Sequence, residues 1–397
     1  MKDIVIVANF CRDFSESDNG RFTYLANMLS EESNVEIITS DFYHSTKAKR
    51  SKKTADWPFE ITFLSEPGYP KNVCLRRFHS HYIFAKNVRK YLERRKTPDV
   101  IYCAVPSLDV ALAASEYAKK NNVKFIVDIQ DLWPEAFKMV FDIPVLSNLI
   151  FAPMNRAANK IYAVADEVVA VSRTYADRAM KINKKCKSPT AVFLGTELAK
   201  FNAHKVNEPI LKKAEDEVFM AYIGTLGNSY DLISVMDAMI LLGKENKIPN
   251  LKFVVMGGGD LWNRFEAYAK ENNLPVEFLG KLPYPQMVSE LSNCDFAVNP
   301  IRKGSAGSII NKVGDYAAAG IAVVNTQECK EYRDLLDEYN AGINCENGNI
   351  KDLASTIERL YNDAELRRKM GKASRKLAEE KFDRAKTYKK ICELIVK

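Results

Sequence analysis

Short apolar runs alternate with longer amphipathic stretches along the whole chain. In the first half, the apolar runs predict strands, and apolar residues at helical spacing predict helices between them. The predicted strands are residues 3–9, 35–39, 60–64, 99–103, 123–128, 167–171 and 190–193, and the helices include 22–30, 79–96, 108–119 and 172–182. Such alternation is typical of a parallel α/β domain.

The same alternation starts again in the second half. Its predicted elements are strands 218–223, 251–256, 276–279, 295–298 and 322–325 and helices 231–246, 260–271, 284–292 and 329–336, followed by two C-terminal helices. A polar stretch at 196–217 separates the halves, and 397 residues exceed what one core normally holds. We therefore predict domains over 1–200 and 201–380 and a last helix over 381–397. That helix, with Tyr388, Ile391 and Ile395 at helical spacing, could be a surface helix of the second domain.

Composition excludes several classes of protein. The chain has 47% hydrophobic and 27% charged residues, as in soluble globular proteins, and no run of 18 apolar residues that could span a membrane. The apolar part of residues 1–9 is too short for a signal peptide, so we expect a cytoplasmic protein. None of the eight cysteines forms Cys-x-x-Cys, and no histidine has a companion cluster of cysteines or acids. Neither a metal site nor a disulfide framework is predicted.

The formal net charge of +7 is too small and too dispersed to predict nucleic-acid binding. Basic residues do gather at 47–53 and again at Lys71, Arg76 and Arg77. These side chains could belong to ordinary solvated loops. They could also attract anionic lipid headgroups or an acceptor that carries a diphosphate.

A glycine-rich loop at 303–308 precedes a short predicted helix that begins at Asn311 and ends before Gly320. A loop that leads into a helix N-terminus offers unpaired N–H groups and the positive end of a dipole, which suits a phosphate. Lys312 adds a positive charge there, and Asp315 lies one turn further, where it could accept hydrogen bonds from sugar hydroxyls. The segment therefore predicts a nucleotide-sugar cradle, although an ordinary helix-to-strand unit with a surface acid would look similar.

Two more glycine loops follow predicted strands of the second half. Residues 224–228 read Gly-Thr-Leu-Gly-Asn, and residues 257–259 are three glycines before Asp260. Glycines let a phosphate approach the backbone closely, because no Cβ atom is in the way. The first loop is not Gly-x-Gly-x-x-Gly, so a dinucleotide oxidoreductase is not indicated.

In the first half, the strand at 123–128 ends in a polar elbow that reads Asp-Leu-Trp-Pro-Glu at 131–135. Elbows at the carboxyl ends of parallel strands form ligand crevices, so Asp131 is a candidate for contact with a sugar or an acceptor hydroxyl. It could instead cap the following helix.

These segments, in this order, resemble the motifs of retaining glycosyltransferases of family 4 with the GT-B fold. The most similar branch builds bacterial capsule and O-antigen repeats and has Asn-Lys-x-x-Glu-Tyr-x-x-x-Gly where this chain has residues 311–320. The resemblance covers essentially the full length. It implies an α/β protein in which two doubly wound Rossmann-like domains face each other across a cleft, and a C-terminal helix that crosses back to the first domain.

The resemblance also implies roles for individual residues. The second domain would bind the donor, with Asp315 on the ribose, Lys281 and Leu282 on the base, and Lys312 on the diphosphate. The full set of implied donor-binding residues is Gly224, Thr225, Gly227, Asn228, Gly258, Lys281, Leu282, Ser308, Ile309, Ile310, Asn311, Lys312 and Asp315. The implied acceptor-side residues are Asn19, Gly20, Arg21, Asp131 and Glu135, and Asp131 and Lys312 would be catalytic.

The chain departs from the family at the donor diphosphate. Many members have an arginine just after the first glycine and a lysine five residues later, where this chain has Thr225 and Tyr230. The first acid of the family's Glu-x7-Glu pattern is replaced by Gly307. Charge neutralisation would then fall on Lys312 and backbone amides, with Lys281, Arg302 or Lys303 as further candidates.

The implied reaction moves a hexose or N-acetylamino sugar from a nucleoside diphosphate, UDP first among them, to a lipid-linked glycan at the inner membrane face. Neither a metal nor another cofactor is expected. The missing charges leave a second interpretation, a catalytically weak, sugar-nucleotide-binding partner subunit of a polysaccharide assembly complex. A nucleotide-sugar 2-epimerase of the same fold would need acids and histidines in the cleft. That is disfavoured because the four histidines all lie within residues 44–204.

Overall fold

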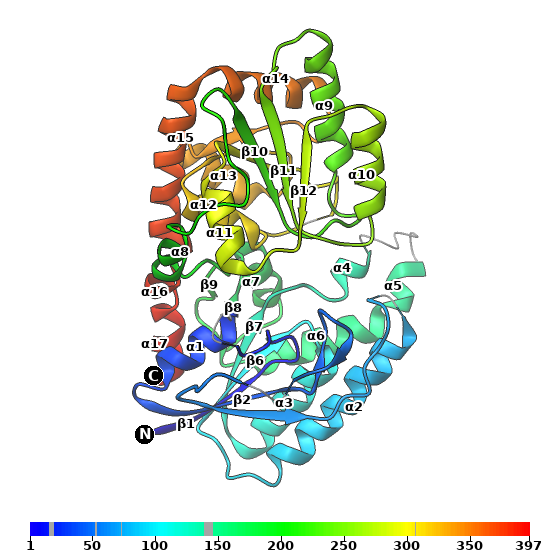
Figure 1. Cartoon of the computed structure of the whole chain (residues 1–397). Coiled ribbons are helices and arrows are strands. Elements are labelled where there is room, and N and C mark those ends of the chain that lie inside the picture. Colours follow the sequence, from blue (N-terminus) through cyan, green and yellow to red (C-terminus); the bar gives the residue numbers. More distant parts are fainter. Residues whose placement is uncertain (16–19, 52–53, 73, 139–145, 306) are drawn as a thin grey trace. The chain divides into compact units, whose positions relative to one another are not determined.

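The structure, a computed structural model, describes residues 1–397 apart from 16–19, 52–53, 73, 139–145 and 306 (Figure 1). Contacts divide the chain into two compact domains. The first domain consists of Met1–Val192 and Tyr388–Lys397, and the second consists of Phe193–Thr387. The contacts thus divide the chain after Val192 and after Thr387, where the sequence analysis predicted boundaries at 200 and 380.

The first domain is built on a parallel sheet that has seven strands in the described residues, in the order β5-β2-β1-β6-β7-β8-β9. The strands are β1 (Lys2–Val7), β2 (Ser33–Ser40), β5 (Glu60–Leu64), β6 (Val100–Val105), β7 (Lys124–Ile129), β8 (Glu167–Ala170) and β9 (Thr190–Ala191). Strand order reverses at β1, which is where open parallel sheets place their ligands.

Helices lie on both faces of this sheet, because successive residues of a buried strand point to opposite sides. Ile4 and Ile6 of β1 face a core cluster that contains residues of α1 and of the last helix, α17. Helices α3 and α6 pack on the other side (Figure 1). The helices of this domain are α1 (Arg21–Leu29), α2 (Leu75–Leu92), α3 (Leu108–Asn121), α4 (Glu135–Lys138), α5 (Leu146–Ile150), α6 (Ala152–Val164), α7 (Arg173–Met180) and α17 (Lys389–Val396).

The last helix belongs to the core of the first domain. Tyr388, Ile391 and Ile395 are fully buried among residues of β1 and α1. Their helical spacing in the sequence is therefore the spacing of a buried stripe, and the alternative of a surface helix of the second domain is wrong.

A short antiparallel hairpin, β3 (Phe42–Tyr43) and β4 (Ala48–Lys49), follows β2. The apolar pattern did not predict it, because two-residue strands carry no periodic signal. The hairpin becomes important below, because it forms part of a pocket.

The second domain repeats the architecture. In the described residues its parallel sheet has six strands in the order β12-β11-β10-β13-β14-β15. The strands are β10 (Val218–Ile223), β11 (Leu251–Met256), β12 (Val276–Gly280), β13 (Phe296–Asn299), β14 (Ala322–Asn325) and β15 (Gly342–Asn344). The helices are α8 (Leu198–His204), α9 (Leu232–Lys244), α10 (Trp262–Glu271), α11 (Tyr284–Ser292), α12 (Lys312–Ala319), α13 (Lys330–Tyr339), α14 (Ile350–Asn362), α15 (Ala364–Leu377), a π-helix (Ala378–Phe382) and α16 (Arg384–Thr387).

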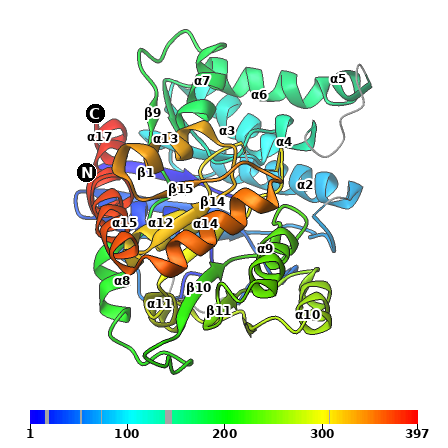
Figure 2. The ribbon, with the colours of Figure 1, turned by 90° about the horizontal axis from the view of Figure 1, so that it is seen from above.

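Two core clusters lie on the two faces of this sheet. One gathers residues of α9, α10 and α14, and the other gathers residues of α8, α11, α12 and α13 (Figure 2). The predicted α/β class with two Rossmann-like domains is therefore confirmed. Edge strand β15 and helix α8 were not predicted, because each is short and carries little periodic signal.

Candidate functional site

The loops that follow β10, β11 and β12 are bonded to one another. The Leu226 N–H donates to the Gly258 carbonyl at 3.0 Å, and the Gly257 N–H donates to the Gly280 carbonyl at 2.8 Å. A Cβ atom on Gly257 would lie 1.7 Å from the Gly224 carbonyl oxygen, so only glycine allows the first two loops to touch. The structure thus brings together the two loops that contain the predicted residues Gly224 and Gly258.

The tip of the β10 loop is accessible. Thr225 and Asn228 are exposed and Gly227 is half-buried. The Arg302 N–H donates to the Ser229 carbonyl at 3.0 Å, which places the exposed Arg302 beside this loop. Lys281 and Leu282 directly follow Gly280, and Lys281 is exposed while Leu282 is half-buried.

Lys312 begins α12 and buries its ammonium group under the β10 loop. Its Nζ lies 3.8 Å from the centre of the Tyr222 ring and 4.1 Å from that of Tyr230, and the residue is 7% exposed. Among the described residues, this nitrogen has no hydrogen-bond partner. Burial lowers the pKa of Lys312 well below its ordinary value. The two rings stabilise a cation only in part, so an anion at this place would stabilise the charged amine.

Asp315 lies one turn further along α12 and is half-buried. Its Oδ1 accepts hydrogen bonds from the Thr196 hydroxyl at 2.9 Å and the Tyr284 hydroxyl at 3.0 Å. A Cβ atom on Gly314 would lie 3.1 Å from the Thr196 Oγ1, so the glycine leaves room for that hydroxyl. The sequence analysis did not single out Thr196, because nothing local links it to a residue 119 positions away.

Buried amides hold the loop that leads into α12. The Gln327 Nε2 donates to the Ser308 carbonyl at 2.7 Å, and the Asn299 Nδ2 donates to Asn325 Oδ1 at 2.9 Å and to Gln327 Oε1 at 3.2 Å. All three amide side chains are fully buried. This network holds the Ser308 carbonyl in the segment that leads into α12. Asn299 and Asn325 each end an otherwise apolar strand, and this position was the sequence signal that could have revealed the amide network.

The remaining residues of this loop differ in exposure. Ser308 and Ile309 are buried, Ile310 is half-buried and Asn311 is exposed. Tyr316, which follows Asp315, is fully buried and its hydroxyl accepts from the Ile223 N–H at 3.1 Å and donates to the Val298 carbonyl at 3.2 Å. The tyrosine of the motif therefore ties α12 to β10 and β13.

In the first domain, Arg21 is engaged inside the fold. Its Nε donates to Asp128 Oδ2 at 2.8 Å and its Nη2 donates to Oδ1 at 3.1 Å, while its Nη1 donates to the Val192 carbonyl and the Tyr388 hydroxyl, each at 3.2 Å. Arg21 is 4% exposed. The guanidinium could meet an acceptor phosphate only if this buried ion pair broke, so we reassign Arg21 to the core. Gly20 is also buried, and Asn19 lies outside the described residues.

Asp131 lines an open pocket of about 270 Å³ in the first domain. Its Oδ1 accepts from the Leu132 N–H at 2.9 Å and the Tyr175 hydroxyl at 3.4 Å, and burial raises its pKa. These bonds do not involve an N–H of α4, so the alternative that Asp131 caps the following helix has no support here.

The other acid of this elbow, Glu135, forms an ion pair with Arg178, and the Arg178 Nε lies 2.6 Å from the Glu135 Oε1. The pocket is lined by Phe10, His44, Arg77, Pro106, Asp131, Trp133, Ala136 and Phe137.

Over the described parts of the chain, no three His, Cys, Asp or Glu side chains are placed to hold a metal ion. In those same parts, no helix has the length and apolar character needed to cross a bilayer.

Comparison with known proteins bears on the second domain first. Residues 204–377 match the family described as Glycosyl transferases group 1. The chain is 27% identical over 180 residues to an uncharacterized glycosyltransferase of Methanocaldococcus jannaschii, a match that covers 44% of this chain and 47% of that protein. It is 21% identical over 348 residues to the putative glycosyltransferase EpsD of Bacillus subtilis, with coverage of 85% and 84%.

Solved structures match the whole fold. Sucrose-phosphate synthase from Thermosynechococcus elongatus is 16% identical, with a TM-score of 0.74 over 99% of this chain and 98% of that one. HepE of Anabaena, solved in complex with UDP and glucose, is 15% identical, with a TM-score of 0.69 over 100% of both chains. The fold is therefore that of GT-B glycosyltransferases, and the family match covers residues 204–377 of the second domain. These comparisons leave the family 4 subclass and the capsule branch as predictions.

Proposed function

We propose that the chain is a retaining glycosyltransferase that moves a hexose or N-acetylamino sugar from UDP to a lipid-linked glycan acceptor in capsule, O-antigen or exopolysaccharide synthesis. The observation that carries the proposal is the buried amine of Lys312. It lies at the N-terminus of α12 beside the Gly224 loop, and no described residue supplies it with a hydrogen bond. A diphosphate at this place would pair with the amine and with the positive end of the helix.

The proposed donor site assigns a task to each predicted residue. The diphosphate contacts Lys312 and the backbone of the 224–228 and 308–311 loops, and exposed Arg302 adds charge from beside the first loop. Asp315, oriented by Thr196 and Tyr284, accepts hydrogen bonds from the ribose. Lys281 and Leu282 contact the base. UDP is the first choice because HepE, which shares the fold, was solved with UDP and glucose.

In the proposed reaction, the bond between the sugar's anomeric carbon and the leaving phosphate oxygen breaks. A bond from the same carbon to the acceptor oxygen forms on the same face of the sugar. The acceptor's proton passes to the leaving diphosphate, so the chain needs no strong base. Its contribution is to position the substrates and stabilise the charge that develops on the diphosphate, which Lys312 does directly. Asp131 faces the acceptor hydroxyl or the transferred sugar, and no metal or other cofactor is required.

Membrane association of the first domain is part of the proposal. Leu75, Phe78 and Tyr82 recur on one face of α2 at spacings of three and four and are exposed, beside the exposed Arg76. An apolar face flanked by positive charge fits the surface of an anionic bilayer. Of the basic cluster at 47–53, Arg50 is not available, because its guanidinium donates to the carbonyls of Cys11 and Ser40.

The proposal is tested by titrating the purified chain with UDP, GDP, ADP and dTDP without metal while following thermal unfolding. A nucleotide at a hundredfold excess over its dissociation constant adds about 2.7 kcal/mol to the free energy of unfolding. Stabilisation by UDP that is lost in Asp315→Ala and kept in Asp334→Ala, an exposed acid on α13, supports the donor site. No stabilisation by any nucleotide would refute it.

A second candidate function is the partner subunit that binds a sugar nucleotide with little catalysis. It is favoured by Thr225 and Tyr230, which replace the family's arginine and lysine. Tyr230 contributes a ring to Lys312 and no charge. Hydrolysis of a UDP-sugar by the isolated chain, detected as free sugar and UDP and abolished in Lys312→Met, would exclude this alternative. Nucleotide binding without turnover, with or without acceptor, would favour it.

A further inference from the structure

Arg77 lies in an aromatic box in the first domain. Its Cζ is 4.6 Å from the centre of the Trp133 ring, 5.5 Å from that of Tyr69 and 5.6 Å from that of Phe10. It sits in the first turn of α2 and lines the same 270 Å³ pocket as Asp131. Cation–π contacts from three rings restrict where the guanidinium can lie.

The hydrogen-bonding capacity of Arg77 is used only in part. Its Nη1 donates to the Asn72 carbonyl at 2.9 Å and its side chain is hydrogen-bonded to Tyr69, whereas its buried Nε has no hydrogen-bond partner in the described part of the chain. The Asp131 carboxylate interacts electrostatically with Arg77 across the same pocket, but no described carboxylate forms an ion pair with the guanidinium. A half-buried guanidinium without a salt-bridge partner is a site that an anion stabilises.

The other titratable groups around the pocket leave it positive. His44 Nδ1 lies 2.6 Å from the Tyr69 hydroxyl, and burial, with Lys47 and Arg77 nearby, lowers the pKa of His44 to about 4. Burial also lowers the pKa of His81 to about 3. Both imidazoles are therefore neutral near pH 7, and Arg77 and Lys47 outweigh the carboxylate of Asp131.

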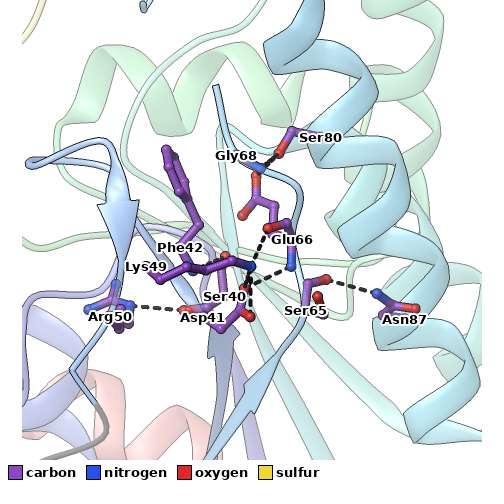
Figure 3. Close-up of polar contacts among 10 residues, drawn as sticks. All are labelled: Ser40, Asp41, Phe42, Lys49, Arg50, Ser65, Glu66, Gly68, Ser80 and Asn87. Atoms are coloured by element: carbon purple, nitrogen blue, oxygen red, sulfur yellow. Dashed lines mark hydrogen bonds and ion pairs between the residues drawn. The ribbon is translucent and has the colours of Figure 1, made fainter. Parts of the chain in front are cut away.

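Hydrogen bonds join the segments from which His44, Tyr69 and Arg77 come, as Figure 3 shows. Asp41 accepts from the Lys49 ammonium at 2.8 Å and from the Glu66 N–H at 2.8 Å, and Lys49 also donates to the Glu66 carbonyl at 2.7 Å. The Ser80 hydroxyl donates to the buried carboxyl of Glu66 at 2.8 Å. These bonds join the β3–β4 hairpin, the end of β5 and α2. The segments that supply His44, Tyr69 and Arg77 are thus held before any ligand arrives, which lowers the entropic cost of binding.

We propose that this pocket binds an anionic group of the acceptor through Arg77, while the body attached to that group packs against Trp133 and Phe137. The inference rests on the proposed function, because it identifies the acceptor of that same reaction as an anion. The anion is a phosphate or a carboxylate, and a lipid-linked diphosphate and an acidic sugar both supply it. Apolar walls with a few placed polar groups are typical of such pockets, and Asp131 lies beside the bound body.

The test uses Trp133 as a reporter. The chain has three tryptophans, so Trp57→Phe and Trp262→Phe together leave Trp133 alone in the pocket. This protein is titrated with inorganic pyrophosphate, with glucuronic acid and with glucose, in the presence of saturating UDP so that the donor site is filled. We expect one of the two anions to change Trp133 fluorescence along a saturating curve. The dissociation constant of glucose should be at least tenfold higher than that of this anion. Pyrophosphate as the preferred probe indicates a diphosphate acceptor, and glucuronic acid indicates an acidic sugar.

Arg77→Gln in the same background should raise the dissociation constant of the preferred anion at least tenfold. Arg94→Gln is the control, because Arg94 is an exposed arginine just after the end of α2, and it should leave that constant unchanged. Arg77→Lys keeps the charge and loses the planar arrangement of donors, so it should give an intermediate dissociation constant. If Arg77→Gln fails to fold, Arg77→Lys takes its place in the test. Equal binding by wild type and the Arg77 variants, an equal loss in the control variant, or no response to either anion would overturn the proposal.

This experiment separates the two proposals. Stabilisation by UDP without an Arg77-dependent anion response refutes the anionic acceptor and leaves the donor site intact. If no nucleotide stabilises the chain, the anion titration is done without UDP. An Arg77-dependent response in that titration refutes the proposed transferase and leaves an anion site in the first domain.

Discussion

The ammonium nitrogen of Lys312 lies 4.1 Å from the centre of the ring of Tyr230, the residue that replaces a lysine of the resembled family. Among the described residues, the basic group under the β10 loop therefore comes from α12, and the ring at position 230 packs against it. This arrangement places an amine beside the Gly224 loop although the loop itself has no basic side chain. It also makes Lys312 the residue on which diphosphate binding most depends.

Replacing Lys312 with Met is expected to weaken UDP binding at least tenfold, which corresponds to about 1.4 kcal/mol. The same change should raise the melting temperature of the ligand-free chain, because it removes a buried amine without a hydrogen-bond partner. Calorimetric titration with UDP and thermal unfolding measure the two effects. A variant that binds UDP like wild type would show that the diphosphate does not reach this amine.

The lowered pKa of Lys312 predicts a pH dependence. The unfolded chain binds a proton at this amine up to a higher pH than the folded chain does. Between the two pKa values, the free energy of unfolding therefore rises with pH. The difference in free energy of unfolding between wild type and Lys312→Met should show this rise. Above the pKa of the amine in the folded chain, UDP binding should be accompanied by uptake of a proton. This uptake is detected because the binding enthalpy then depends on the ionisation enthalpy of the buffer. No such dependence would mean that the amine is already charged.

Gln327 positions the donor loop through the Ser308 carbonyl. Gln327→Leu removes the hydrogen bond that Gln327 donates to the Ser308 carbonyl and the one that it accepts from the Asn299 amide. We therefore expect a loss of roughly 1–3 kcal/mol in the free energy of unfolding, together with weaker UDP binding. Gln286→Leu, which removes an exposed hydrogen bond to the Glu208 carbonyl, is the control. Urea unfolding and calorimetry measure both quantities. Full UDP affinity in the destabilised Gln327 variant would show that the loop keeps its place without the amide.

Thr196 orients Asp315. Thr196→Val keeps the shape and removes the hydroxyl that donates to the carboxylate at 2.9 Å. We expect a cost of about 1 kcal/mol in stability and a several-fold loss of UDP affinity. Tyr284→Phe removes the other donor, and the double variant measures whether the two bonds act together. Additive losses would mean that each hydroxyl holds the carboxylate independently.

The sequence predicted what depends on local patterns. Alternation of apolar runs located nearly every strand of both sheets, and glycines marked the loops that approach each other at Gly224 and Gly257. The sequence did not predict contacts between segments that are distant along the chain. Thr196 meets Asp315, and Arg77 meets rings from positions 10, 69 and 133, only after the sheets have formed. No periodicity encodes such meetings, because they depend on strand order and on where each loop leaves its sheet.

Arg21 shows the same limit, and its reassignment is testable. The resemblance implied an acceptor-side role for Arg21, whereas its side chain forms a buried ion pair with Asp128, 107 positions away. Arg21→Met leaves the Asp128 carboxylate buried without its partner and removes a bond to Tyr388, which anchors the last helix. We expect a loss of about 3–5 kcal/mol from the stability of the first domain, measured by urea unfolding. Arg12→Met, at an exposed position, should be neutral. Unchanged stability together with a raised KM for the acceptor would restore Arg21 to the acceptor side.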